Sequence, residues 1–284
     1  MNLIGREELY NDGIGFVELW DNSKANKSED NRKEVVTNIA SISFGKDKSK
    51  NPDNLYNRLI KENAGKPNTS FEFVPIVLGQ LEMAFLTELA SVIFNKTGQP
   101  YQPHSLKYGN VVIGKDNKAY IITNLRALLH DNYYSVKYFN KDISNWYNKS
   151  EDDFKLIYEN TFLFKYKAPI FVVRHTIRHR VVANELSRRY TKGNFEFYQF
   201  QDKEKLDYSE QVDFYNHLVK DLKWKAEDAR IVLPVALYTT IWQFFPKEQL
   251  DTLFDLRLDK STQEPTRELA EKMKKLVEEK LETN

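Results

Sequence analysis

The stretch from residue 161 to residue 190 constrains the fold of this chain more than any other. Residues 161–167 alternate apolar and polar side chains, as a half-buried strand does. Ala168-Pro169 then opens a helix, because proline is tolerated in a first helical turn. We expect that helix to continue to about Val182. A strand that leads directly into a helix predicts an α/β or α+β domain.

The expected helix and the residues after it form a cation-rich segment, 174–190. Its basic side chains and imidazoles are Arg174, His175, Arg178, His179, Arg180, Arg188 and Arg189. A solvated helix face usually mixes Glu with Lys, whereas arginine suits bidentate binding of phosphate or carboxylate. The segment therefore predicts a site for an anionic ligand. A structural cluster whose arginines pair with distant acids is the alternative.

The remaining sequence indicates mixed secondary structure. We expect strands at 15–20, 119–122 and 194–198. We expect helices at 34–44, 52–64, 124–130, from 210 onward, at 229–245 and at 264–282. Residues 140–155 indicate a solvated surface segment. Trp224, Trp242 and the pair Phe244-Phe245 are expected in the core, and the Lys/Glu alternation after Arg267 on a solvated helix face.

Composition excludes several classes of protein. Lys+Arg number 42 against Asp+Glu 41, so the chain is no general nucleic-acid coat. No apolar run is long enough to cross a bilayer, and the first residues do not form a signal peptide, which predicts a cytoplasmic protein with no membrane partner. Cysteine is absent, which excludes disulfides, thiolate zinc sites and a cysteine nucleophile.

Several blocks of the chain resemble the flavin-dependent thymidylate synthases. RHR at 178–180, followed by NELSRRY at 184–190, resembles the signature of that family, in which a serine follows RHR at a fixed spacing. Further similar blocks, in the same order as in the family, are GFVEL at 15–19, TSFEF at 69–73, KAPIFVVRHTIRHR at 167–180, NFEFY at 194–198, ARIVLPVALYT at 229–239 and DLRLDKSTQEPTRELA at 255–270. Such ordered matches are more specific than one short motif.

The resemblance implies an α/β (α+β) fold: an antiparallel or mixed sheet with flanking helices and a helical C-terminal part. We expect one domain, 1–284, with an insertion at about 78–160. The family methylates dUMP to dTMP using FAD, methylene-tetrahydrofolate as the carbon donor and NADPH as the reductant. It assembles as a homotetramer with active sites shared between subunits. The commoner thymidylate synthases use a cysteine thiolate, which this chain lacks.

Residue roles carry over by motif. The flavin would contact Arg178, His179, Arg180, Ser43, Thr69 and Glu72. The nucleotide would contact Arg174, His175, Glu185, Ser187, Arg188, Arg189, Arg230 and Arg257. In these assignments Arg189 holds the phosphate, and Arg257 meets the uracil ring. A guanidinium there would stabilise charge that develops on the ring during methylation, so Arg257 and Ser187 are the catalytic candidates.

The chain departs from the family pattern in four places. Six residues separate Arg180 from Ser187, one fewer than usual, and we place the deletion in a turn near Val182-Ala183. His175 stands where glutamine is usual, and Arg188 where glycine is usual. The Asn-x-Arg flavin contact falls on Pro246-Lys247-Glu248, which lacks both side chains. We hypothesise that Asn124 and Arg126 of the insertion replace it; the alternative is a capped surface helix.

Other interpretations of these residues are weaker. His175 and His179 lack the neighbouring glutamate of a metalloprotease site, and arginines beside them repel cations, so we expect no metal. Ser187 has no evident His-Asp partners, which favours a hydrogen-bonding hydroxyl over a nucleophile. Two rival functions remain open. One is a related flavoenzyme that modifies another pyrimidine nucleotide, and the other is a non-catalytic nucleotide- or RNA-binding protein.

Overall fold

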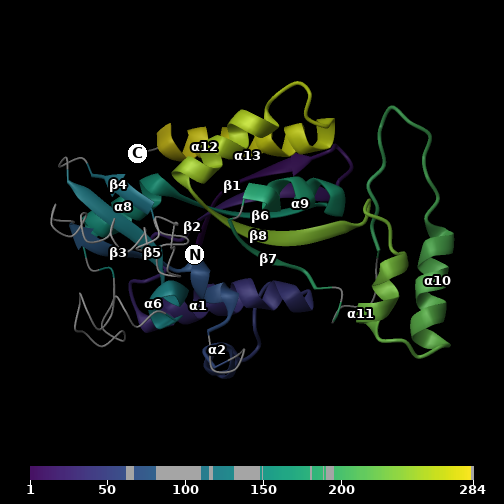
Figure 1. Ribbon diagram of the computed structural model, residues 1–284, viewed down its shortest axis with the longest axis horizontal. Coiled ribbons are helices and arrows are strands. Elements are labelled where there is room, and N and C mark those ends of the chain that lie inside the picture. The colour runs from purple at the N-terminus through teal and green to yellow at the C-terminus, as the bar shows by residue number, and fades with distance from the viewer. Residues whose placement is uncertain are drawn as a thin grey trace, which may run out of the picture.

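The computed structural model describes residues 1–61, 67–80, 110–114, 118–130, 148, 150–179, 181–187, 189 and 195–282. Its centre is a five-stranded antiparallel sheet in the order β1-β2-β6-β8-β7. The strands are β1 (Asn2–Leu9), β2 (Gly15–Asp21), β6 (Thr161–Pro169), β8 (Tyr238–Pro246) and β7 (Val182–Glu185). The expected mixed α/β fold with an antiparallel sheet and flanking helices is confirmed (Figure 1).

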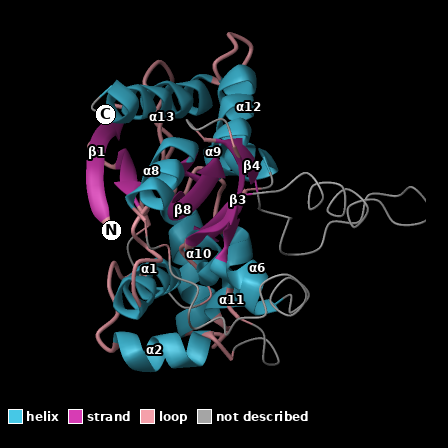
Figure 2. Cartoon of the chain, turned by 90° about the vertical axis from the view of Figure 1, so that its left-hand side faces the viewer, coloured by secondary structure: helices cyan, strands magenta, loops and turns pink. Residues whose placement is uncertain are grey.

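Helices cover both faces of this sheet. One face packs against α9 (Ile170–Thr176), α12 (Lys247–Arg257) and α13 (Glu264–Glu282) through Phe162, Phe164 and Tyr166 of β6. The other face packs against α1 (Glu29–Ser41), α2 (Pro52–Leu59) and the 3-10 helix η2 (Thr69–Phe73) through Leu163 of β6. Figures 1 and 2 show these two helical layers on either side of the strands.

A second, smaller sheet lies in the middle of the chain. It has the order β3-β5-β4, from β3 (Pro75–Gln80), β5 (Ala119–Asn124) and β4 (Asn110–Ile113). Two helices flank it, α6 (Leu125–His130) and α8 (Glu151–Asn160). A capping box at Ser150 and Asp153 fixes the start of α8, since each side chain accepts a hydrogen bond from the other residue's backbone N–H.

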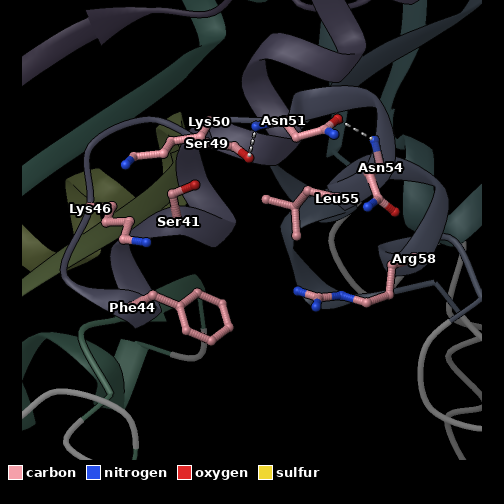
Figure 3. Close-up of a pocket in the computed structure, with 9 residues that line it drawn as sticks. All are labelled: Ser41, Phe44, Lys46, Ser49, Lys50, Asn51, Asn54, Leu55 and Arg58. Atoms are coloured by element: carbon pink, nitrogen blue, oxygen red, sulfur yellow. Dashed lines mark hydrogen bonds between the residues drawn. The ribbon is translucent and has the colours of Figure 1, made fainter.

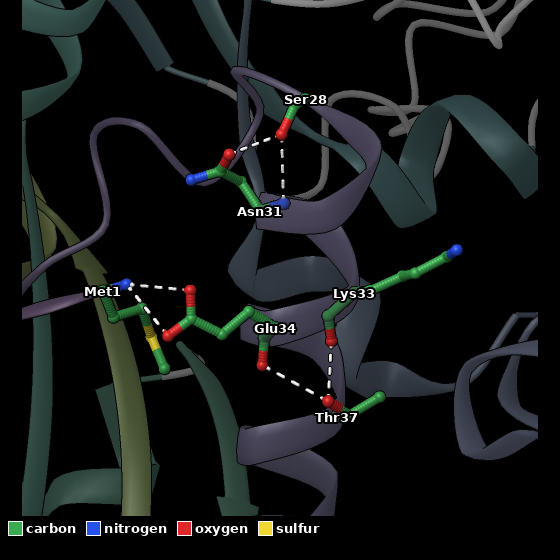
Figure 4. Close-up of polar contacts among 6 residues, drawn as sticks. All are labelled: Met1, Ser28, Asn31, Lys33, Glu34 and Thr37. Atoms are coloured by element: carbon green, nitrogen blue, oxygen red, sulfur yellow. Dashed lines mark hydrogen bonds and ion pairs between the residues drawn. The ribbon is translucent and has the colours of Figure 1, made fainter. Parts of the chain in front are cut away.

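The helix α1 is fixed at its start and along its length (Figure 4). Ser28 caps it by accepting a hydrogen bond from the Asn31 N–H at 3.2 Å. The amino group of Met1 lies 3.4 Å from the Glu34 carboxylate, which ties the edge strand β1 to this helix. Thr37 donates to the carbonyl of Lys33 within the helix. The 3-10 helix η1 (Ile42–Phe44) follows directly and carries Ser43.

A helical arm extends from the sheet at the far right of Figure 1. It comprises α10 (Ser209–Lys220), α11 (Ala226–Ala229) and the 3-10 helix η6 (Arg230–Val232), and it has a small apolar cluster of its own. Large apolar side chains remain exposed on or beside the arm: Leu206, Phe214, Leu222, Trp224, Ile231 and Val235. The expectation that Trp224 is buried is therefore wrong, whereas Trp242, Phe244 and Phe245 are buried as expected.

Four predicted elements differ from the structure. The expected helix at 229–245 is wrong, because from Tyr238 onward it is β8, which pairs with β6 along its whole length and with β7 at 241–244. The helix expected to reach Val182 ends at Thr176 and continues only as the 3-10 helix η5 (Ile177–His179). The turn expected near Val182-Ala183 is instead the strand β7. In the expected strand 194–198, Phe197 forms a single bridge with Leu237.

Candidate functional site

A cluster of cations forms where η5 meets the end of α12. It contains Arg178 and His179 of η5, His175 of α9 and Arg257, the last residue of α12. Burial lowers the pKa of His175 and of His179, and the nearby charge of Arg257 lowers both further. Burial, followed by the charge of Arg178, lowers the pKa of Arg257 as well. Four basic groups from distant parts of the chain therefore share one electrostatic environment.

Three nitrogens in this cluster are buried without a hydrogen-bond partner among the described residues. They are His175 Nδ1, His179 Nε2 and Arg257 Nε. Unsatisfied buried polar atoms are uncommon, because each one forfeits its hydrogen bonds to water. Cations that remain together without a counter-charge have the chemistry of an anion site. The cluster can accept a phosphate or an electron-rich carbonyl oxygen.

A second group of predicted site residues meets beside the edge strand β7. Ser43 Oγ donates to the backbone carbonyl of Glu185 at 3.2 Å, and the Ser187 N–H donates to the backbone carbonyl of Ser43 at 3.2 Å. Asn184 fixes this contact, since its Nδ2 donates to the Ile39 carbonyl at 2.6 Å. The C-terminal end of α1 therefore positions the signature serine. Sequence reasoning missed the positioning role of Asn184, although the residue lies within the motif.

A third group joins the middle segment to η2. Arg126 of α6 forms an ion pair with the buried carboxylate of Glu72, and its Nε donates to the Pro67 carbonyl at 3.0 Å. Thr69 begins η2, and Asn124 is buried in β5 directly before α6. Arg126 therefore contacts Glu72, one of the predicted flavin-contacting residues. That Asn124 and Arg126 bind flavin stays a prediction.

These groups occupy opposite faces of the five-stranded sheet. The cation cluster lies on the face that α9 and α12 cover, whereas η1 and η2 pack with α1 on the other face. Figure 1 shows α12 and α1 on opposite sides of the strands. The predicted flavin-contacting residues are therefore divided within the chain: Arg178 and His179 lie on one side of the sheet, and Ser43, Thr69 and Glu72 on the other. The strand β7 and the segment after it connect the two sides.

The end of the signature contacts the helical arm. Arg189 Nε lies 2.7 Å from Glu227 Oε2 of α11, and this hydrogen bond lowers the pKa of the Glu227 carboxyl. Arg230 follows on η6, close enough for its charge to lower the pKa of Glu227 too. Arg174 is exposed at the end of α9. The predicted site residues Arg180 and Arg188 lie outside the described residues.

A basic cavity near Ser43 was not anticipated from the sequence. It has a volume of about 350 Å³ and lies between the loop after η1 and the helix α2 (Figure 3). The run Lys46-Asp-Lys-Ser-Lys50 is the one sequence signal that could have indicated it. Among the described residues, no group of three His, Asp or Glu side chains has the geometry of a metal site, and no helix is long and apolar enough to cross a bilayer.

Comparison with known proteins identifies the relatives of this chain. Residues 151–282 match the family model described as thymidylate synthase complementing protein. The flavin-dependent thymidylate synthase of Thermotoga neapolitana is 33% identical over 134 residues, which cover 42% of this chain and 62% of that protein. The enzyme of the same name from Pseudothermotoga lettingae is 37% identical over 122 residues, 36% of this chain and 54% of that protein.

A third relative matches over a longer stretch. The flavin-dependent thymidylate synthase of Thermosipho melanesiensis is 33% identical over 159 residues, which cover 47% of this chain and 68% of that protein. The chain thus spans less than two thirds of the length of the Thermotoga and Pseudothermotoga proteins. It spans slightly more than two thirds of the Thermosipho protein. A crystal structure of a UMP/dUMP methylase, PolB from Streptomyces cacaoi, aligns at 23% identity with a TM-score of 0.36, over 43% of this chain and 74% of that one. The family model and the curated relatives agree, and the chain belongs to the flavin-dependent thymidylate synthase family.

Proposed function

We propose that this protein methylates dUMP to dTMP in the cytoplasm, using FAD, methylene-tetrahydrofolate and NADPH. The observation that carries this proposal is the cation cluster beside η5, in which His175, His179 and Arg257 each bury a nitrogen that has no partner among the described residues. The reaction requires such a site, because the flavin phosphates, the nucleotide phosphate and the folate tail are all anions. Near-equal numbers of acidic and basic residues, 41 and 42, argue against the rival RNA-binding function.

In the proposed site the two faces of the sheet hold different parts of the flavin. Arg178, His179 and Arg180 bind its phosphates, since a guanidinium group can donate two parallel hydrogen bonds to a phosphate. On the other face the contacts are made by Ser43, Thr69, Glu72, Asn124 and Arg126. The reduced flavin supplies the hydride, and the protein positions it against the substrate. Arg126 neutralises the buried carboxylate of Glu72, which supports an insertion at about 78–160 that completes this half of the site.

The nucleotide is bound by the signature and by two later arginines. Arg189 and Arg230 hold the phosphate, and Arg174, His175, Glu185 and Arg188 surround the nucleotide. Arg257 donates hydrogen bonds to the uracil ring, and its lowered pKa makes the guanidinium a stronger donor to the charge that develops there. Ser187 contributes a hydroxyl hydrogen bond. Its position is set by the contact between its N–H and Ser43.

We infer a homotetramer with shared active sites. The predicted flavin contacts lie on opposite faces of the sheet, so each face holds only half of a site. A neighbouring copy of the chain could supply the missing half to each. The arm carries Arg230 and several exposed apolar side chains, including Phe214, Trp224 and Ile231, of the kind that subunit contacts bury. The arm would bring Arg230 and Arg189 to the cation cluster of a neighbouring subunit.

A related flavoenzyme that modifies another pyrimidine nucleotide is the second candidate function. His175 favours it, because the chain places an imidazole of lowered pKa in the cation cluster where the family has glutamine. The two candidates differ in the nucleotide that is methylated, so the identity of the product separates them.

The proposed function is tested with the purified full-length protein. We expect a yellow protein whose flavin absorbance bleaches with NADPH and that forms dTMP from dUMP and methylene-tetrahydrofolate. Arg257→Ala should lower kcat/KM at least 100-fold, whereas Lys260→Ala, an exposed cation three residues later, should leave it unchanged. A protein that binds flavin but forms no dTMP would contradict the proposal and would favour another pyrimidine nucleotide. A colourless protein that takes up no FAD would exclude both candidates.

A further inference from the structure

None of the roles proposed above uses the cavity beside η1. It opens between the loop that contains Lys46 and Lys50 and the helix α2, which carries Asn54 and Arg58. Its volume of about 350 Å³ is in the range of small-molecule sites. It adjoins the candidate flavin site, because Phe44 on its floor directly follows Ser43 in η1.

Two cations face this cavity from opposite sides. Figure 3 shows the Arg58 side chain reaching in from α2 and the Lys46 ammonium reaching in from the loop, whereas Lys50 points away. The loop can approach α2 because Gly45 turns the chain with φ 68°, in the left-handed region. Side chains from the loop after η1 and from α2 therefore point into the same cavity.

The nearby carboxylates that the structure describes, Asp47 and Asp53, do not neutralise these cations. Asp47 lies 2.8 Å from Lys165, and Asp53 lies 2.9 Å from Lys33, so both acids are paired with lysines outside the cavity. Within the described part of the chain, the cavity lining contains Lys46, Lys50 and Arg58 and no acidic residue. Like charges kept together without a counter-ion favour an anionic ligand.

The lining also indicates what the rest of the ligand is. The Phe44 side chain remains 41% exposed at the base of the cavity, where a flat base can lie against its ring. Ser49 and Asn54 add hydroxyl and amide groups that hydrogen-bond a sugar. An aromatic ring, polar side chains and two facing cations together match a nucleoside that carries a phosphate on its ribose.

We propose that this cavity binds the adenosine 2′-phosphate end of NADPH, with Arg58 and Lys46 on the phosphate and Phe44 against the adenine. The inference rests on the proposed function, because it is that reaction which requires a hydride donor. The position beside Ser43 directs the remainder of the dinucleotide toward the flavin half-site. The two cations then select NADPH over NADH, since NADH lacks the 2′-phosphate.

The test measures binding of adenosine 2′,5′-bisphosphate and adenosine 5′-monophosphate by titration calorimetry, together with flavin bleaching by NADPH and NADH. We expect the bisphosphate to bind at least 10-fold more tightly than the monophosphate. Arg58→Gln and Lys46→Gln should each remove most of that preference and raise the KM for NADPH but not for NADH. Lys50→Gln removes the same charge from a side chain that points away, so it should behave as the wild type.

Three outcomes would overturn the inference. The wild type could show no preference for the bisphosphate, or Arg58→Gln could match Lys50→Gln in every measurement. Equal weakening of both nucleotides by Arg58→Gln would assign the cavity to another adenylate, such as that of FAD. Thermal melting checks that each variant is folded. Formation of dTMP by the wild type with dithionite-reduced flavin tests the proposed function separately, because it needs no NADPH.

Discussion

Arg189 of the signature segment donates from Nε to the Glu227 carboxylate of the arm at a distance of 2.7 Å. The side chains are 51% and 33% exposed, so water screens this ion pair and it contributes little to stability. The same guanidinium is the proposed contact for the dUMP phosphate. Glu227 therefore competes with the nucleotide for Arg189.

Glu227→Gln should tighten dUMP binding by about threefold, because it removes a weak, solvent-screened competitor for Arg189. Titration calorimetry with dUMP measures the change. Asp228→Asn is the matched control, since it removes the same charge from the neighbouring exposed position. Weaker dUMP binding by Glu227→Gln, or equal effects of the two variants, would show that Glu227 does not compete for Arg189.

Arg126→Ala should reduce FAD affinity at least 10-fold and lower the free energy of unfolding by about 2 kcal/mol, because Glu72 then remains buried without its cation. Flavin retention after gel filtration and chemical denaturation measure these effects. The double variant Arg126→Ala, Glu72→Gln should recover stability but not flavin binding. Full flavin retention by Arg126→Ala would remove Arg126 from the proposed flavin site.

Anion binding at the cation cluster should take up protons. Burial and neighbouring arginines lower the pKa of His175 and of His179, so near pH 6.5 each binds fewer protons in the free protein than an ordinary imidazole does. A bound anion favours the charged imidazolium and raises both pKa values. The affinity for inorganic phosphate or dUMP should therefore increase as pH falls through that range.

Calorimetry in buffers of different ionisation enthalpy measures this proton uptake. His179→Asn should reduce the uptake, whereas His217→Asn, which changes an exposed histidine of the arm, should not. Proton release on binding, or uptake that His179→Asn leaves unchanged, would contradict an anion site at this cluster.

Lys280→Met should stabilise the protein, and more so at pH 6 than at pH 10. Lys280 is 2% exposed, with its ammonium donating to the Thr161 carbonyl at 2.9 Å, and burial lowers its pKa to about 7. The unfolded chain therefore binds more protons than the folded chain between about pH 7 and pH 10, so wild-type stability rises with pH across that window. Methionine removes this penalty, which is largest below pH 7.

Melting temperatures across this pH range check the prediction, with an expected increase of about 5 °C at pH 6. Lys274→Met, an exposed lysine on the same helix, should change the melting temperature little. Equal shifts at both pH values would show that the Lys280 charge does not limit stability.

Local patterns predicted some elements of this fold well. The alternation at 161–167 gave β6, and the charged amphipathic run at 264–282 gave α13, because period and length together distinguish a strand from a helix. Residues 229–245 wrongly predict a helix, because the apolar part that forms β8 is buried on both faces and shows no alternation of apolar and polar side chains. Ile241, Trp242, Phe244 and Phe245 are all buried between the two helical layers of the sheet.

The sequence by itself determined that arginines and histidines gather around residues 174–190, that no cysteine chemistry is possible, and which family the chain resembles. Only the tertiary structure decided which of these groups meet. Arg257 reaches Arg178 because α12 packs beside η5, and Arg126 reaches Glu72 because α6 packs against η2. Such contacts depend on how distant elements pack, and no local periodicity encodes them. The division of the proposed flavin site between two faces of the sheet follows from the same packing.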